Sequence, residues 1–123
     1  MIKILFIASG GALGSIARYY LANSFLKNYI FFDIPLAILS INVVGSFFFG
    51  ILMGFIESNY ITAENLKIFL ISGFLAAFTT FSTFAWESVG LIQQEMYIKL
   101  VIYCLASITL SILFCLYGYQ LGK

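Results

Sequence analysis

Residues 66–92 read LKIFLISGFLAAFTTFSTFAWESVGLI, and this stretch decides the fold class of the chain. A helix needs about 20 mainly apolar residues to cross the hydrocarbon core of a bilayer. The stretch from Leu66 to Ile92 exceeds that length, and Lys67 and Glu87 are its only charged residues. It therefore predicts a membrane-spanning helix.

Three more stretches of the same kind occur elsewhere in the chain, at Ile4–Phe25, Ile34–Ile56 and Ile98–Leu121. The single proline, Pro35, suits the first turn of the second helix, where its missing N–H costs nothing. Hydrophobic residues make up 63% of the chain and charged residues only 9%, whereas globular proteins carry roughly 25% charged residues. We therefore expect an all-α integral membrane protein, multi-pass in the cell membrane, in which residues 1–123 form a single four-helix transmembrane domain.

The residue inventory excludes several classes of site. There is no histidine, which removes histidine-based acid–base catalysis, Ser-His-Asp triads and zinc sites of the Cys/His type. The two cysteines, Cys104 and Cys115, would lie about 16 Å apart on a straight helix, too far for a disulfide. The six basic residues are scattered singly and form no basic patch of the kind that nucleic acid requires. We expect neither an enzyme nor a nucleic-acid-binding protein.

The basic residues are shared equally between the two ends of the predicted helices. Four spans put three of them on each side of the membrane: Lys3, Lys67 and Lys123 on one, and Arg18, Lys27 and Lys99 on the other. Orientation follows an excess of Lys and Arg in the short cytoplasmic loops, and here neither side has one. Either another cue orients the chain, or the chain inserts both ways and pairs with its own inverted copy. We favour the second interpretation, and with it a homodimer.

The centre of the third predicted helix carries four hydroxyl side chains, at Thr79, Thr80, Ser82 and Thr83. Hydroxyls can hydrogen-bond the backbone and bend a helix, and β-branching lowers helical preference. We therefore predict an interruption at Thr79, close to the bilayer midplane. A break at membrane depth frees backbone carbonyls, which can line a cavity or coordinate a cation.

Polar side chains also occur inside the second and fourth predicted helices. Asn42 needs hydrogen-bond partners within the membrane, which either a neighbouring helix or a solute can supply. Tyr103, Ser107 and Ser111 recur every fourth residue and so share one face of the fourth helix. This stripe of hydroxyls favours a polar track along an otherwise apolar helix.

Glycines recur every fourth residue in the first two predicted helices. Gly10 and Gly14 precede Arg18 in the first helix, and Gly50 and Gly54 follow Asn42 in the second. Such spacing lets another backbone approach closely, so we expect packing seams. Arg18 must then reach an interface or find acceptors. Glu87, near the end of the third helix, is expected at the membrane interface, paired with a basic group.

The side chains expected inside the membrane limit the kind of solute that the protein can conduct. Cation and proton pathways use intramembrane acidic residues or histidine, and the sequence places neither at mid-helix. Phe81 and Phe84 share a helix face, which ordinarily indicates core or lipid contacts, but rings set edge-on present the positive part of their quadrupole. Together with neutral N–H and O–H donors, they suit a small anion. From the residues alone we infer a passive pathway for a small, strongly hydrated polar solute or anion.

Three motifs carry a resemblance to a known family: residues 10–19 (GGALGSIARY), 42–47 (NVVGSF) and 73–84 (GFLAAFTTFSTF). Together they resemble the Fluc/CrcB family of fluoride ion channels, over all four spans in order. The resemblance implies an antiparallel, dual-topology homodimer with two pores. It also implies passive export of fluoride from the cytoplasm across a bacterial plasma (inner) membrane, which lowers fluoride toxicity.

The resemblance further implies roles for individual residues. It places Asn42, Phe81 and Phe84 on the fluoride path, with ring edges from both subunits contributing. It matches Thr83, Tyr103, Ser107 and Ser111 to the family's polar track. It implies a structural Na⁺ at the dimer centre, held by the backbone carbonyls of Ala76 and Thr79, and a vestibule or structural role for Arg18. The family commonly has Gly-Gly where this chain has Ala76-Ala77, and alanine resists positive φ.

Two alternatives to a fluoride channel remain open from the sequence. A small dual-topology multidrug/proton exchanger has a similar size, but it would need an acidic residue in the middle of the first helix, and this helix has none. A membrane subunit without transport activity would use Asn42 and Phe81 for assembly alone. Fluoride efflux from liposomes separates both alternatives from a channel.

Overall fold

The computed structural model describes residues 1–28, 30–31 and 33–123. Its elements in chain order are α1 (Ile2–Tyr20), η1 (Leu21–Phe25), β1 (Ile30–Phe31), β2 (Ile34–Pro35), α2 (Leu36–Glu57), α3 (Glu64–Lys67), η2 (Ile68–Leu75), α4 (Ala76–Phe78), α5 (Phe81–Gln93) and α6 (Tyr97–Gly122). The elements labelled η are π-helical segments. α3, η2, α4 and α5 together form the third span.

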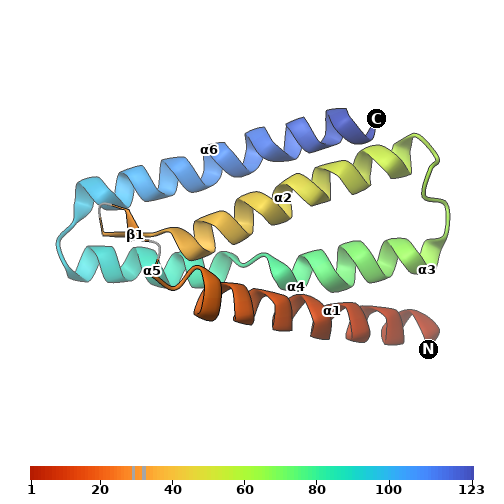
Figure 1. Ribbon diagram of the computed structural model, residues 1–123, viewed down its shortest axis with the longest axis horizontal. Helices are drawn as coiled ribbons and strands as arrows, with labels where there is room; N and C mark the ends of the chain where they lie inside the picture. Colours follow the sequence, from red (N-terminus) through yellow and green to blue (C-terminus); the bar gives the residue numbers. More distant parts are fainter. Residues whose placement is uncertain (29, 32) are drawn as a thin grey trace.

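Within the described residues, four helical stretches are long and apolar enough to cross a membrane: Ile2–Ser24, Leu36–Glu57, Glu64–Gln93 and Tyr97–Gly122. They confirm the predicted all-α protein with four spans. α2 lies beside α6, and α1 lies beside the third span (Figure 1). Both termini and the loop between α2 and α3 lie at one end of the bundle, which we call the terminal end. The β1–β2 hairpin and the connection between α5 and α6 lie at the other end, the hairpin end.

The third span is interrupted where the sequence predicts it. α4 ends at Phe78, and Thr79 and Thr80 adopt extended conformations before α5 begins at Phe81. Their φ/ψ values are −79°/154° and −149°/122°. The interruption lies near the middle of the stretch Glu64–Gln93, and it is visible in Figure 1 as the thin connection between α4 and α5.

Glycines bring the backbones of α1 and the third span into contact. A Cβ added at Gly10 would lie 3.0 Å from the backbone N of Phe74, and one added at Gly73 would lie 2.9 Å from Gly10 Cα. Gly14 similarly faces the backbone of Phe74. The predicted seam along the first helix is confirmed, and its partner is the π-helical segment η2.

A second glycine seam joins α2 to α6. A Cβ added at Gly54 would lie 2.6 Å from the carbonyl oxygen of Tyr119, and one added at Gly50 would lie 2.8 Å from the backbone N of the same residue. Gly118 and Gly122 of α6 face the backbone of α2 in return. The molecule is therefore built from two closely joined pairs, α1 with η2 and α2 with α6.

The hairpin before α2 fills the space at the hairpin end. β1 and β2 pair antiparallel, with Ile30 opposite Pro35 and Phe31 opposite Ile34. Pro35 is the N-cap residue of α2, at φ −71° and ψ 113°, and not part of its first turn as we predicted. The proline ring fixes φ at a value that both an extended residue and a helical residue can adopt, so Pro35 can end β2 directly before α2 begins. Ile34 is buried together with Ile38, and both belong to the core that also contains Phe84 and Tyr103.

Candidate functional site

Asn42 of α2 holds the peptide groups at the break. Its Oδ1 accepts a hydrogen bond from the backbone N–H of Thr80 at 2.8 Å, and its Nδ2 donates to the carbonyl oxygen of Thr80 at 2.9 Å. The side-chain amide thus pairs with the backbone of one extended residue in both directions. The partner that Asn42 requires in the membrane is therefore a neighbouring helix, and Nδ2 retains a second N–H that this pair does not use.

The side chain of Thr80 begins the second half of the span. Its hydroxyl accepts a hydrogen bond from the backbone N–H of Thr83 at 3.2 Å, which makes it the N-cap of α5. The same hydroxyl donates to Thr83 Oγ1 and shares a hydrogen bond with Ser82 Oγ, each at 3.2 Å. Thr80 is only 7% exposed. The hydroxyl cluster that suggested a break is thus what caps the helix after it.

The break frees the carbonyls predicted to bind a cation. In a continuous helix the N–H of Thr80 would donate to Ala76, but Asn42 takes it instead. Among the described residues, no backbone N–H donates to the carbonyls of Ala76 or Thr79. Free carbonyl oxygens are ligands that a hard cation such as Na⁺ accepts, so the donor set fits this ion.

The alanine pair before the break needs no unusual conformation. Ala76 has φ −63° and ψ −34°, and Ala77 lies within α4. The non-glycine residues with positive φ in the described chain are Asp33, Asn59 and Glu95, which all lie in connections between helices. The pair Ala76-Ala77 is therefore compatible with this break.

A groove runs beside the break, and we call it the central groove. It has a volume of about 380 Å³, and its lining comes from α2, the third span and α6. It brings together five of the predicted path residues, namely Asn42, Phe81, Phe84, Ser107 and Ser111. Thr79 and Thr80 line it as well, and none of its lining residues is charged. Ala76 is not among them.

The two phenyl rings occupy different environments. The ring centroids of Phe81 and Phe84 are 5.5 Å apart, with an angle of 51° between the planes. Phe84 also lies 5.2 Å from the ring of Tyr103 and is 9% exposed, whereas Phe81 is 78% exposed. Phe84 is thus a core residue that reaches the groove, and Phe81 stands on its open rim.

The predicted polar track divides into two parts. Ser107 Oγ is buried and has no hydrogen-bond partner among the described residues, and both Ser107 and Ser111 line the central groove. Tyr103 is fully buried, and its hydroxyl donates to the carboxylate of Glu87. The expectation that Glu87 pairs with a basic group is therefore wrong. Because helix α5 lies against α6, this carboxylate meets a phenol instead.

A second groove, of about 840 Å³, is lined by α1, η1, the start of α2 and α5. We call it the basic groove, because its lining includes Arg18 and Lys27. Thr83 and Glu87 line it too, so Thr83 is separated from the other predicted path residues. Thr80 lines the central groove and is bonded to Thr83. Thr80 is a site residue that was not predicted from the sequence, although its position inside the hydroxyl cluster is a signal for it.

Comparison with known proteins places the chain in a family. A family model described as "CrcB-like protein, Camphor Resistance (CrcB)" matches residues 5–119. A protein of Campylobacter fetus subsp. fetus named "Fluoride-specific ion channel FluC" is 40% identical over 120 residues, which are 98% of this chain and 93% of that protein. The "Fluoride-specific ion channel FluC" of Azobacteroides pseudotrichonymphae is 42% identical over 122 residues, or 98% of this chain and 96% of its own length. "Fluoride-specific ion channel FluC 1" of Methanosarcina acetivorans is 37% identical over 123 residues, with coverage of 100% and 89%. With its four spans, broken third span and this similarity along nearly its whole length, the chain belongs to the CrcB family.

Proposed function

We propose that this protein is a fluoride-specific ion channel, which lets fluoride leave the cytoplasm passively and so lowers its toxicity. It is a multi-pass membrane protein of the bacterial plasma membrane and not an enzyme. Membership of a family whose named relatives are fluoride channels supports this function. The observation that carries it is the central groove, where an uncharged lining combines phenyl rings with a buried hydroxyl that has no hydrogen-bond partner in the described part of the chain.

This lining suits the dehydration of a small anion. A halide that leaves water needs hydrogen-bond donors, and a neutral donor attracts it without binding it as tightly as a fixed cation would. Ser107 supplies an O–H with no competing partner among the described residues. The rings of Phe81 and Phe84 supply positively polarised edges beside it. Among the residues that the structure describes, none in this lining offers a cation a carboxylate.

The pathway is completed by a second copy in the opposite orientation. Phe81 stands open on the rim of the central groove, where a partner could cover it and add ring edges of its own. The equal division of basic residues between the two ends allows both orientations in the membrane. We therefore propose an antiparallel, dual-topology homodimer with two pores.

A structural Na⁺ is proposed at the centre of this dimer. The carbonyls of Ala76 and Thr79 would hold it, and their freedom from backbone hydrogen bonds supports this assignment. The ion would neutralise the converging carbonyl dipoles of the broken helices. Sodium depletion should therefore weaken dimer assembly.

The remaining polar residues are assigned to the approach and the track. We assign Thr83, Tyr103, Ser107 and Ser111 to the polar track and Asn42 to the path beside Phe81 and Phe84. Ser107 and Ser111 line the central groove, whereas Thr83 lines the basic groove and Tyr103 is buried against Glu87. Arg18 lies in the basic groove, where a cation at the rim would attract anions from solution. This position supports a vestibule role for Arg18.

Fluoride efflux from liposomes tests the function. Vesicles that contain purified protein and fluoride should release fluoride rapidly and electrogenically, and the same vesicles loaded with chloride should not release chloride. Phe81→Ile should reduce the fluoride flux and leave dimerisation intact, since it removes the ring edge but keeps most of the volume. Proton-coupled drug exchange without fluoride flux would instead indicate an exchanger, and no flux of any kind would leave only a structural subunit.

A further inference from the structure

We propose that Asn42 is a positioning residue, which sets the geometry of the break through the peptide groups of Thr80. The inference rests on the proposed channel function and assigns a specific role within it. Asn42 holds the third span in its broken form, and its contribution to permeation is made through Phe81 and the freed carbonyls.

The two hydrogen bonds define the orientation of the amide. Oδ1 of Asn42 accepts from the Thr80 N–H at 2.8 Å, and Nδ2 donates to the Thr80 carbonyl at 2.9 Å. Rotating the amide by half a turn would oppose donor to donor and acceptor to acceptor, and it would lose both bonds. The side chain therefore occupies the place that a neighbouring strand would take beside an extended residue. Both bonds are partly buried, so water competes poorly for them.

These two hydrogen bonds, which we call the clamp, fix the backbone of Thr80 in its extended form. Without Asn42, the Thr80 N–H and carbonyl would both lose the partner that this side chain supplies. The break would then be free to change its geometry. Since α5 begins at Phe81, directly after Thr80, the ring of Phe81 would be the first to move from the groove.

Because Asn42 belongs to α2, the clamp links the α2–α6 pair to the third span. α2 is joined closely to α6 through the seam at Gly50 and Gly54, and α6 carries Ser107. A hydrogen bond from α2 to the break therefore places Phe81 relative to Ser107, which lines the same groove. Asn42 connects the α2–α6 pair to the broken span in this way.

Amide exchange at Thr80 tests the clamp without any measurement of transport. The chain has five threonines, so labelling threonine with an NMR-active nitrogen isotope yields a small set of backbone signals. In Asn42→Ala the Thr80 amide should exchange about tenfold faster than in the wild type, because it has lost one hydrogen bond. Thr109, within α6, should be unchanged. Asn42→Asp keeps an acceptor for this N–H and should restore slow exchange.

Ser46→Ala provides the matched control. Ser46 lies one turn along α2 and lines the same groove, but it makes no side-chain hydrogen bond to the break among the described residues. This variant should leave exchange at Thr80 unchanged. If Asn42→Ala accelerated exchange at Thr109 as strongly as at Thr80, general unfolding would explain the result and the proposal would fail.

Fluoride flux and the fluoride-to-chloride flux ratio complete the test. In Asn42→Ala both should fall while the dimer persists, since a displaced ring changes selectivity and a mere loss of folded protein does not. Lost flux with unchanged exchange at Thr80 would make Asn42 a ligand for the ion and overturn the proposal. Faster exchange with full, selective flux would overturn it too. Wild-type protein without fluoride flux would instead refute the channel function, whatever the exchange rates are.

Discussion

Thr80 connects the two halves of the third span through its side chain as well as its backbone. Its hydroxyl caps α5 by accepting the Thr83 N–H, and the side chain is almost fully buried. Thr80→Val keeps the shape and removes the cap. We expect this variant to lose about 1–2 kcal/mol of stability, measured as a lower thermal unfolding midpoint in detergent.

Thr80→Ser is the control for the cap, since it keeps the hydroxyl and removes only a methyl group. It should retain most of the stability that the valine variant loses. If valine were as stable as threonine at this position, the observed hydrogen bond would contribute nothing to α5, and the hydroxyl cluster would need another explanation.

Removing the hydroxyl of Ser107 should not lower stability, unlike removing that of Thr80. The buried hydroxyl of Ser107 has no hydrogen-bond partner among the described residues. An unpaired buried polar group costs about 1–3 kcal/mol. Ser107→Ala should therefore be as stable as the wild type or more stable, yet it should conduct fluoride more slowly. Thermal unfolding and liposome efflux measured on the same preparation check both parts. A clear loss of stability would indicate that the hydroxyl has a structural partner, and unchanged flux would remove it from the track.

At the level of elements, the glycines of α1 offer a paired test of the seam with η2. A Cβ added at Gly14 would lie 3.0 Å from the carbonyl carbon of Phe74, whereas one added at Gly11 would meet nothing within 4 Å. Gly14→Ala should destabilise the protein by about 1–3 kcal/mol, as overpacking does. Gly11→Ala should stabilise it by about 0.5–1 kcal/mol, because alanine is the better helix former.

Thermal unfolding in detergent compares the two alanine variants directly. They lie in the same helix and add the same methyl group, so their difference reports the backbone contact alone. Equal effects would mean that α1 can move away from η2 at little cost, and the seam would then not define the position of the third span.

The sequence predicts the spans and the break because each depends on local composition. Apolar length defines a span, and the hydroxyls at Thr79 and Thr80 disfavour a helix wherever that segment lies. Five of the predicted path residues meet in one groove because each lies in the middle part of its membrane span, and spans that cross the same bilayer align their centres. Thr83 lies apart from them since it projects from another face of α5.

Other features depend on contacts that a single sequence does not encode locally. The π-helical segments η1 and η2 contain no proline and no charged residue, so the sequence gives no signal that separates them from α-helix. The packing of η2 against α1 appears only in the folded chain. The pairing of Glu87 with Tyr103 requires the packing of α5 against α6. The clamp of Asn42 on Thr80 joins residues 38 positions apart, and spacing within one helix cannot reveal it.

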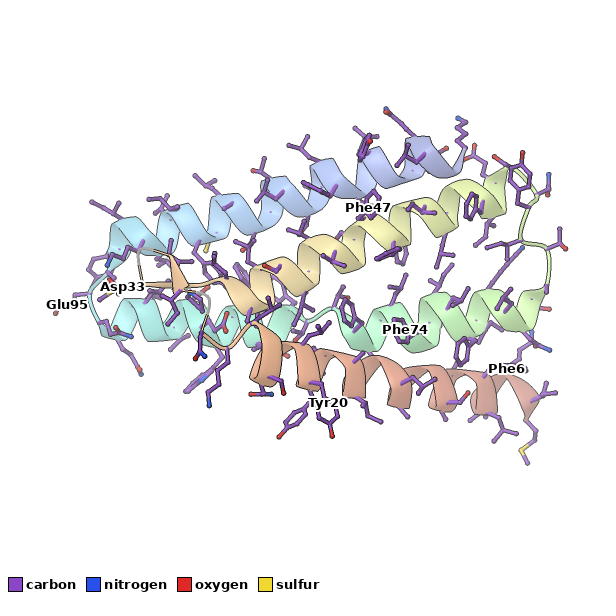
Figure 2. All side chains as sticks on the ribbon, viewed as in Figure 1. Phe6, Tyr20, Asp33, Phe47, Phe74 and Glu95 are labelled. Atoms are coloured by element: carbon purple, nitrogen blue, oxygen red, sulfur yellow. The ribbon has the colours of Figure 1, made fainter. Side chains whose placement is uncertain are left out.

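At the scale of the whole molecule, ion pairs balance charge at both ends of the bundle. Lys3 pairs with Glu64 at 2.6 Å at the terminal end, and Lys99 pairs with Asp33 at the hairpin end. Figure 2 places Asp33 and Glu95 together at that second end. Such exposed pairs contribute little to stability. They leave the equal division of Lys and Arg between the two ends unchanged.

Two added lysines should therefore fix the orientation of the chain. Thr62→Lys with Ala63→Lys adds basic residues to the exposed loop between α2 and α3, and Gln93→Lys with Gln94→Lys adds them at the exposed α5–α6 connection. By the positive-inside rule, each double variant should insert mainly one way round, and the two should insert oppositely. Cysteine labelling from outside the cell measures the orientation of each.

Because the proposed pore needs two inverted copies, each double variant expressed alone should give cells little fluoride export. Co-expression of the two should restore it, since each then supplies the orientation that the other lacks. Thr62→Gln with Ala63→Gln, and Gln93→Asn with Gln94→Asn, change the same residues without adding charge and so control for the loss of local contacts. If either lysine variant alone were fixed in one orientation and still exported fluoride at the wild-type rate, then a parallel assembly would be sufficient. The open rim at Phe81 would in that case have to be covered by something other than an inverted partner.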